Sequence, residues 1–116
     1  MAKHLKTGKK GEELAVEFLQ KKGFEIIERN YRIGKAELDI IAKNENLMIF
    51  IEVKTRTNNR FGFPESFVDR RKENLITEAA EQYTYDCQWH GNIRFDIIAI
   101  SLKPNLEIEH FEDAFY

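Results

Sequence analysis

The sequence contains a single cysteine, Cys87, so no disulfide can form within the chain. No apolar run approaches the ~20 residues needed to cross a bilayer, and the first residues lack the apolar stretch of a secretory signal. The three histidines, His4, His90 and His110, are too scattered for a zinc motif. A phosphate-binding glycine loop and a Ser-His-Asp arrangement are missing as well. These absences predict a protein of the reducing cytoplasm with no membrane partner.

The composition is that of a folded globular protein. Apolar residues make up 42% of the chain and charged residues 33%, a balance that disordered segments do not have. The 116 residues show no internal repeat, low-complexity tract or linker. We therefore predict one domain over residues 1–116.

Charge is distributed unevenly along the chain. Residues 105–116 carry a local charge of −4, so the rest of the chain is +2 although the total is −2. Basic residues form two groups: Lys3, Lys6, Lys9 and Lys10 at the start, and Lys54, Arg56, Arg60, Arg70, Arg71 and Lys72 in the middle. Either group is suited to contact phosphates, whereas charge alone favours the simpler interpretation of a solvated surface.

Hydrophobic periodicity predicts two helices and five strands. Helices are expected at 8–22 and 65–85, and strands at 24–33, 36–42, 47–56, 92–101 and 106–111, with a turn-rich loop at 57–64. The strand at 47–56 is apolar on both faces in its first half and is expected at the centre of the sheet, with the last strand at an edge. The order α-β-β-β-α-β-β predicts an α/β fold with a mixed central sheet of about five strands flanked by helices.

Two acidic residues stand on neighbouring predicted strands. Alternation places Asp39 on the face of its strand opposite to Leu38 and Ile40, while Glu52 and Lys54 share a face of the next strand. Glu52 follows five apolar residues, and a buried carboxylate without a partner is very costly. A hairpin between these strands would bring Asp39 close to Glu52 and Lys54, provided that the register joins their faces.

Glu12 adds a third carboxylate. On a helical wheel it borders the apolar stripe that faces the sheet, whereas Glu13 and Glu17 point away. Magnesium takes oxygen ligands from one or two carboxylates and keeps several waters, which leaves room for a phosphate oxygen. Lys54 would then orient the attacking water or stabilise developing charge, and it could act as a base only if its pKa fell.

The same residues have a structural interpretation. Glu-x-Lys is a common pattern and, by itself, is most often a same-face or cross-strand salt bridge. The combination of Glu12, Asp39, Glu52 and Lys54 favours a metal site over an isolated salt bridge, but the spacing alone leaves both interpretations open. Asp96, on a strand rich in isoleucine, is expected to make a structural hydrogen bond.

The motifs resemble those of the YraN-like uncharacterised proteins. The resemblance lies in residues 8–15, 30–32, 37–42, 50–56, 61–64, Lys72 and 94–96, and it covers nearly the whole chain. That family is similar to archaeal Holliday-junction resolvases and other PD-(D/E)xK nucleases, which share the restriction-endonuclease-like fold. The resemblance therefore implies that fold here.

The resemblance also implies roles for individual residues. Asp39 would be the metal-binding aspartate of the first motif, and Glu52 and Lys54 the acidic residue and lysine of the second. Glu12 would match the helix glutamate of the resolvase-like branch. Ala36 departs from the pattern, because the family often has glycine directly before Glu-x-Asp; the departure concerns the shape of the turn and leaves the acidic residues in place.

These observations lead to one expectation and two alternatives. The expectation is a nuclease dependent on Mg²⁺, or alternatively Mn²⁺, that acts on structured or branched DNA, with Lys9, Lys10, Arg56 and Lys72 contacting nucleic acid. Analogy with two-fold enzymes acting on two-fold junctions suggests a homodimer. The alternatives are a nucleic-acid-binding module that does not cleave, and a small structural or partner-binding protein.

Overall fold

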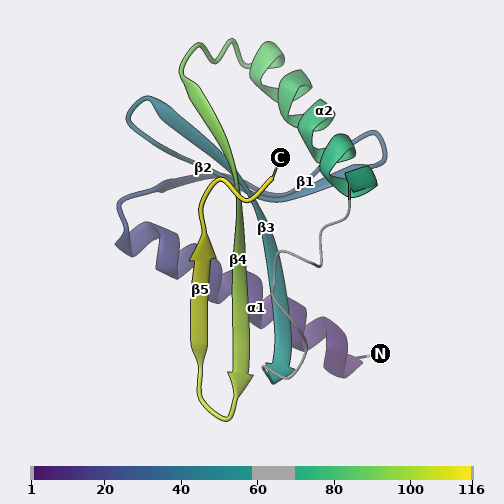
Figure 1. Ribbon diagram of the computed structural model, residues 1–116, viewed down its shortest axis with the longest axis vertical. Coiled ribbons are helices and arrows are strands. Elements are labelled where there is room, and N and C mark those ends of the chain that lie inside the picture. Colours follow the sequence, from purple (N-terminus) through teal and green to yellow (C-terminus); the bar gives the residue numbers. More distant parts are fainter. Residues whose placement is uncertain (1, 59–69, 116) are drawn as a thin grey trace.

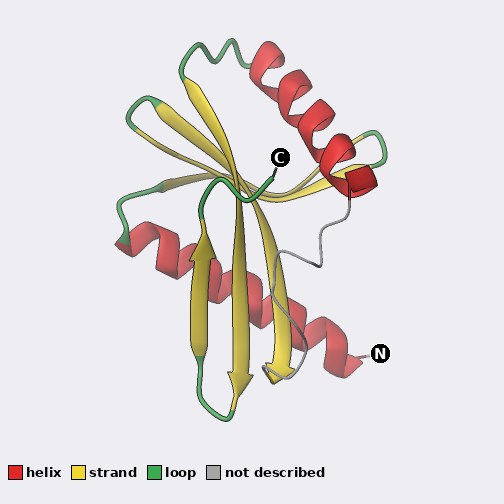
Figure 2. Cartoon of the chain, in the orientation of Figure 1, coloured by secondary structure: helices red, strands yellow, loops and turns green. Residues whose placement is uncertain are grey.

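Within residues 2–58 and 70–115, which the computed structural model describes, the chain forms two helices and a five-stranded sheet (Figure 1; Figure 2). The elements are α1 (Ala2–Lys21), β1 (Glu25–Ile33), β2 (Ala36–Asn44), β3 (Leu47–Asn58), α2 (Arg70–Asp86), β4 (Asn92–Lys103) and β5 (Glu107–Phe111). The predicted α/β order is confirmed. The predicted start of the second helix at 65, and residues 59–64 of the predicted loop, lie outside the described residues.

The sheet is mixed, and β3 is its central strand. The spatial order is β1-β2-β3-β4-β5; β3 and β4 run parallel and every other neighbouring pair is antiparallel. A parallel pair needs a crossover connection, and the segment containing α2 supplies it. A mixed sheet with this element order is consistent with the nuclease-like fold, and β5 lies at an edge as predicted.

Two apolar layers cover the two faces of the sheet. One layer contains Ala15 and Leu19 of α1, and the other contains Ile76, Ala80 and Tyr83 of α2. Strand residues alternate between the layers: Ile49 and Ile51 pack towards α1, and Met48 and Phe50 towards α2. The helices therefore lie on opposite faces, and the centre of β3 is buried on both sides.

The first helix is longer than predicted. It begins at Ala2 instead of residue 8, because residues 2–7 contain no proline or glycine and Gly8 alone does not interrupt it. It ends as predicted before Gly23, whose φ of 96° is a left-handed conformation that favours glycine. Neither α1 nor α2, the helices in the described residues, is long and apolar enough to span a membrane.

The predicted alternation along β2 is wrong at Leu38. Leu38 packs in the same layer as Ile41, on the α2 side, whereas Ile40 packs towards α1. The reason is a change in pairing, because the ladder with β3 runs from the Asn44–Leu47 pair to the Ile40–Ile51 pair. Beyond that point β2 is paired with β1 and leaves β3. Asp39 stands at this divergence.

Candidate functional site

Asp39 occupies the gap that opens where β2 leaves β3. Its Oδ2 accepts a hydrogen bond of 2.9 Å from the backbone N–H of Val53, one residue beyond Glu52. The Val53 amide follows the last β2–β3 pair, so the carboxylate takes the place of a strand partner. The predicted proximity of Asp39 to the Glu52 region follows from this contact.

Glu52 is a nearly buried carboxylate held by two lysines. Its side chain is 5% exposed. The Nζ of Lys54 lies 3.4 Å from Oε1, and the Nζ of Lys72 donates a hydrogen bond to the same oxygen. Lys54 comes from the same strand, whereas Lys72 comes from the first turn of α2, the helix that packs on this face of the sheet. Two ammonium groups thus offset the cost of burying this charge.

A cavity of about 220 Å³ joins the two carboxylates. Its lining residues are Lys35, Ala36, Glu37, Asp39, Glu52, Lys72, Leu75 and Ile76. The turn between β1 and β2 borders one side and the first turns of α2 border another. Asp39 and Glu52 therefore face one space that is large enough for a hydrated cation, and Lys72 stands at its wall.

The electrostatics of the cavity disfavour two ionised carboxylates. Burial raises the pKa of the Asp39 carboxyl to about 7; the nearby Glu52 charge adds to this, and the hydrogen bond from the Val53 amide opposes it. Burial also lowers the pKa of Lys54, although the Glu52 charge opposes that change. Burial opposes the charge of Lys72 too, but its contact with Glu52 prevails and raises its pKa. A cation bound between the two carboxylates would favour the ionised form of Asp39.

The donor set fits magnesium. Mg²⁺ is commonly held by one or two carboxylates together with waters, and Asp39 and Glu52 supply the carboxylates at one cavity. Among the described side chains, which are those of residues 9–56 and 70–115, no three His, Cys, Asp or Glu groups form a ready-made metal cluster. A cation here would therefore depend on water for the rest of its coordination.

Glu12 lies in α1, beside the point where the helix touches β3. The close contact is between Gly11 and Thr55, where a Cβ on the glycine would lie 1.8 Å from Thr55 Oγ1. Glu12 is half-buried, whereas Glu13 and Glu17 are exposed, as the helical wheel predicted. The charge of Glu12 contributes to the raised pKa of Asp39, but Glu12 does not line the cavity. It therefore stands within electrostatic range of the site.

The residues predicted to contact nucleic acid lie in different settings. Lys9 and Lys10 are exposed on α1, and Arg56 is half-buried on β3, two residues beyond Lys54. Lys72 is engaged with Glu52, a contact that the sequence did not reveal. The side chains of Lys3 and Lys6, and all of Arg60, lie outside the described residues. A role in binding phosphate stays a prediction for all of these residues.

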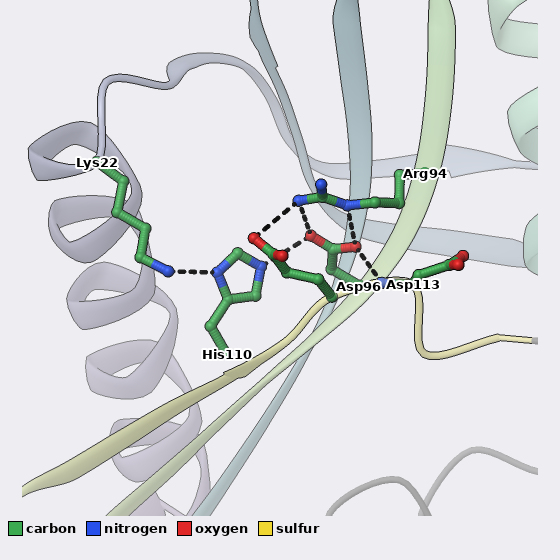
Figure 3. Close-up of polar contacts among 6 residues, drawn as sticks. Lys22, Arg94, Asp96, His110 and Asp113 are labelled. Atoms are coloured by element: carbon green, nitrogen blue, oxygen red, sulfur yellow. Dashed lines mark hydrogen bonds and ion pairs between the residues drawn. The ribbon is translucent and has the colours of Figure 1, made fainter.

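A second polar network surrounds Asp96, which is fully buried on β4 (Figure 3). Arg94 donates to both carboxylate oxygens, from Nε and Nη2, each over 2.9 Å. His110 of β5 lies 2.8 Å away through Nε2, and the backbone N–H of Asp113 donates over 3.0 Å. These donors outweigh burial, which alone would raise the pKa of Asp96, and hold that pKa below its ordinary value. The expected structural hydrogen bonding of Asp96 is confirmed.

His110 extends this network to α1. Its Nδ1 lies 2.9 Å from the Nζ of Lys22, one residue beyond the helix end. The Lys22 ammonium is a donor, so Nδ1 accepts and the ring hydrogen sits on Nε2, which donates to Asp96. The network thus links the end of α1 to β4, β5 and the turn at Asp113 (Figure 3). None of its residues lines the cavity that contains Asp39 and Glu52.

Sequence reasoning identified Lys54 as a partner of Glu52, but it missed Lys72 as the second partner and His110 as a partner of Asp96, for one reason. Lys72 is 20 positions from Glu52, and His110 is 14 positions from Asp96. No local periodicity connects residues at such separations. Two features of the sequence pointed to the Glu52 contact: Glu52 stands in an apolar strand, where a buried carboxylate requires a cationic partner, and Lys72 fits the motif pattern.

Comparison with known proteins places the chain in a set of close relatives. Residues 11–100 match the model of a family described as "Uncharacterised protein family UPF0102". A UPF0102 protein of Flavobacterium psychrophilum is 50% identical over 117 residues, covering 100% of this chain and 98% of the relative. One from Cytophaga hutchinsonii is 52% identical over 98 residues, covering 84% and 87%. One from Dictyoglomus turgidum is 45% identical over 106 residues, covering 90% of each.

Proposed function

The chain belongs to the UPF0102 family, and we propose that it is a divalent-metal-dependent nuclease that hydrolyses phosphodiester bonds in structured or branched DNA. The observation that carries the proposal is the pairing of Asp39 and Glu52 on one cavity beside Lys54 and Lys72. A buried aspartate whose pKa is raised, together with Glu52 and two ammonium groups, suits a site that binds both a cation and a phosphate.

Each residue has a part in this proposal. Asp39 and Glu52 hold Mg²⁺, or alternatively Mn²⁺, and the negative charge of Glu12 strengthens the attraction for the cation. The bound ion would polarise the phosphodiester and lower the pKa of the attacking water. Lys54 shares a face of β3 with Glu52, so its ammonium is placed to orient water or to stabilise charge on the phosphate.

Basic residues on neighbouring surfaces supply DNA contacts. Lys9 and Lys10 are exposed on α1, and Arg56 continues the face of β3 that carries Lys54. A nucleic-acid-binding module without catalysis would gain nothing from Asp39 and Glu52, because carboxylates repel phosphate unless a cation lies between them. The carboxylates therefore favour a nuclease over a binding module.

One observation favours a structural alternative. Lys54 and Lys72 already neutralise Glu52, so the ion pairs are complete without a metal. In that case the residues would serve only to join α2 to β3. The two candidates differ in one measurable property, which is the binding of a divalent cation that depends on Asp39.

The test is calorimetric titration with Mg²⁺ and Mn²⁺ at low salt, with and without a four-way DNA junction. We expect wild type to bind and Asp39→Ala to lose at least about tenfold in affinity, since a ligand is removed. Asp86→Ala, an exposed aspartate at the end of α2, is the matched control and should bind like wild type.

A positive result leads to a cleavage assay on junctions, flaps and duplexes. Lys54→Met should keep metal binding and lose cleavage by about 100-fold or more, because its ammonium acts on the reacting phosphate. If wild type binds no cation even with DNA present, the nuclease proposal fails and the structural alternative stands.

A further inference from the structure

Building on the proposed metal site, we infer that Lys72 is a built-in competitor whose ammonium holds Glu52 in the metal-free protein and must be displaced before a divalent cation can bind. Lys72 donates to Oε1 of Glu52, and both residues line the cavity that Asp39 faces. The lysine thus lines the cavity and contacts the Glu52 oxygen that would hold a cation. A divalent cation and the Lys72 ammonium are both positively charged, so they would repel each other if both were bound to Oε1 of Glu52.

The competition follows from the burial of Glu52. A carboxylate that is 5% exposed needs a close counter-charge in the absence of metal. Lys54 approaches only to 3.4 Å, and Lys72 makes the shorter contact with the same oxygen. Lys72 therefore neutralises Glu52 in the resting protein, and a divalent cation at Glu52 removes the need for it.

The position of Lys72 allows it to leave. Its side chain is 40% exposed, and it sits in the first turn of α2, so its flexible stem can turn towards solvent without moving the helix. The released ammonium stays at the rim of the cavity, where a phosphate bound by the cation would lie. Metal binding thus converts a partner of Glu52 into a contact for the DNA backbone, and the two ligands assist each other.

The first test compares the affinity for Mn²⁺ and Mg²⁺, without DNA, of wild type, Lys72→Gln and Lys35→Gln. Lys35 lines the same cavity, and no ion pair joins it to Glu52 among the described residues. Removing any nearby positive charge favours cation binding slightly, so we expect about twofold tighter binding for Lys35→Gln. We expect Lys72→Gln to bind about tenfold tighter, or more, because the competing ion pair is gone.

A second measurement follows Lys72 itself. In wild type, saturating Mg²⁺ should move the side-chain NMR resonances of Lys72 towards those of a solvated lysine, while Lys35 changes little. Lys72→Arg keeps a cation against Glu52 and should keep metal binding as weak as in wild type or weaker. Thermal melting of each variant without metal verifies that the chain is folded.

The outcomes separate this inference from the proposed function. Tighter binding by Lys72→Gln alone, or metal binding that appears only in that variant, supports the competition. Metal binding by wild type that Lys72→Gln leaves unchanged or weakens overturns the competition and leaves the nuclease proposal intact. Failure of both proteins to bind a cation, with the four-way junction present as well as without it, overturns the two together.

Discussion

The carboxyl of Asp39 makes the stability of the metal-free protein depend on pH. Its pKa is raised to about 7 in the folded chain, by burial first and the Glu52 charge second, against an ordinary value of 3.8. Between these values the folded state binds more protons than the unfolded state, so this group lowers stability as pH rises. Above about pH 7 the loss is complete, because both states are then ionised.

Asp39→Asn should therefore gain stability relative to wild type as pH rises from about 4 to 7, and then level off. The asparagine side-chain oxygen still accepts from the Val53 amide but carries no charge. We expect a gain of roughly 1–2 kcal/mol at pH 8, after allowing for the partial exposure of the site. Urea unfolding without divalent ions measures it. Asp86→Asn, at an exposed position, should show no such trend, and a gain that grew towards acid pH would contradict the assignment.

At this scale the sequence predicted which acidic residues lie close together but not all of their partners. Asp39, Glu52 and Lys54 could be grouped because strand alternation and a short hairpin connect them. Lys72 could not be assigned to Glu52, since the connection depends on how α2 packs across β3. Strand periodicity predicts which face most strand side chains occupy, whereas the angle of a helix across a sheet is set by packing over the whole layer.

The packing of α1 on β3 depends on a glycine in the helix, because no side chain fits at that position. Gly11 is buried, and a Cβ at this position would lie 1.8 Å from Oγ1 of Thr55 and 2.8 Å from its Cβ and Cγ2. A side chain at this position would therefore force the helix away from the strand, and Glu12 would move with the helix. The position thus couples helix packing to the charge that Asp39 experiences.

Gly11→Ala should destabilise the protein by about 1–3 kcal/mol despite the higher helix propensity of alanine. Thermal or urea unfolding measures the change. Adding Thr55→Ala removes two of the three close contacts and should restore part of the loss. The difference in stability between Glu13→Gly and Glu13→Ala, at an exposed position in the same helix, measures the intrinsic helix preference for alanine over glycine. If Gly11→Ala proved stabilising by that intrinsic amount, the close approach would not exist.

Among the elements, type and order could be predicted more fully than boundaries. Hydrophobic periodicity identified both helices and all five strands of the described chain, and the doubly apolar pattern placed β3 at the centre. The helix α1 began earlier because nothing in residues 2–7 stops a helix. Leu38 was assigned to the wrong face because β2 exchanges partners near Asp39, and only the pairing of three strands together determines that change.

On the scale of the whole molecule, Asp96 holds together segments that are far apart in the chain. Through Arg94, His110 and the Asp113 amide it connects β4 to β5 and to the turn that follows. Beyond this turn the chain folds back over the other face: the Ala114 N–H donates to the Phe95 carbonyl, and Phe115 stacks on Phe95 with ring centroids 5.5 Å apart. The acidic C-terminal residues are thus part of the folded structure, and Asp96 positions the turn that leads to Phe115.

Asp96→Asn should accordingly destabilise the protein by about 2–4 kcal/mol, because it removes the charge that Arg94 and the surrounding donors require in a fully buried position. The ionised Asp96 carboxylate contributes fully to the free energy of unfolding above its ordinary pKa of 3.8, and this contribution disappears as pH falls through the lower pKa of the folded state. The difference in stability between variant and wild type should therefore shrink only in strong acid. Urea unfolding across pH measures this. Hydrogen exchange should at the same time show faster opening of β5 and the Ala114 amide than of β2, since the lost contacts lie at that edge.

The matched control for this change is Glu112→Gln. Glu112 is the second acidic partner of Arg94, at 3.4 Å, but its side chain is 58% exposed. An exposed ion pair contributes at most about 1 kcal/mol, so this variant should remain close to wild type at every pH. Equal losses of stability in the two variants would mean that Arg94 stabilises the protein as much through its exposed ion pair with Glu112 as through Asp96. The buried carboxylate would then have no special part in holding the C-terminal turn. A large loss confined to Asp96→Asn would establish that the C-terminal turn is held from within the sheet, independently of the proposed metal site on the opposite face.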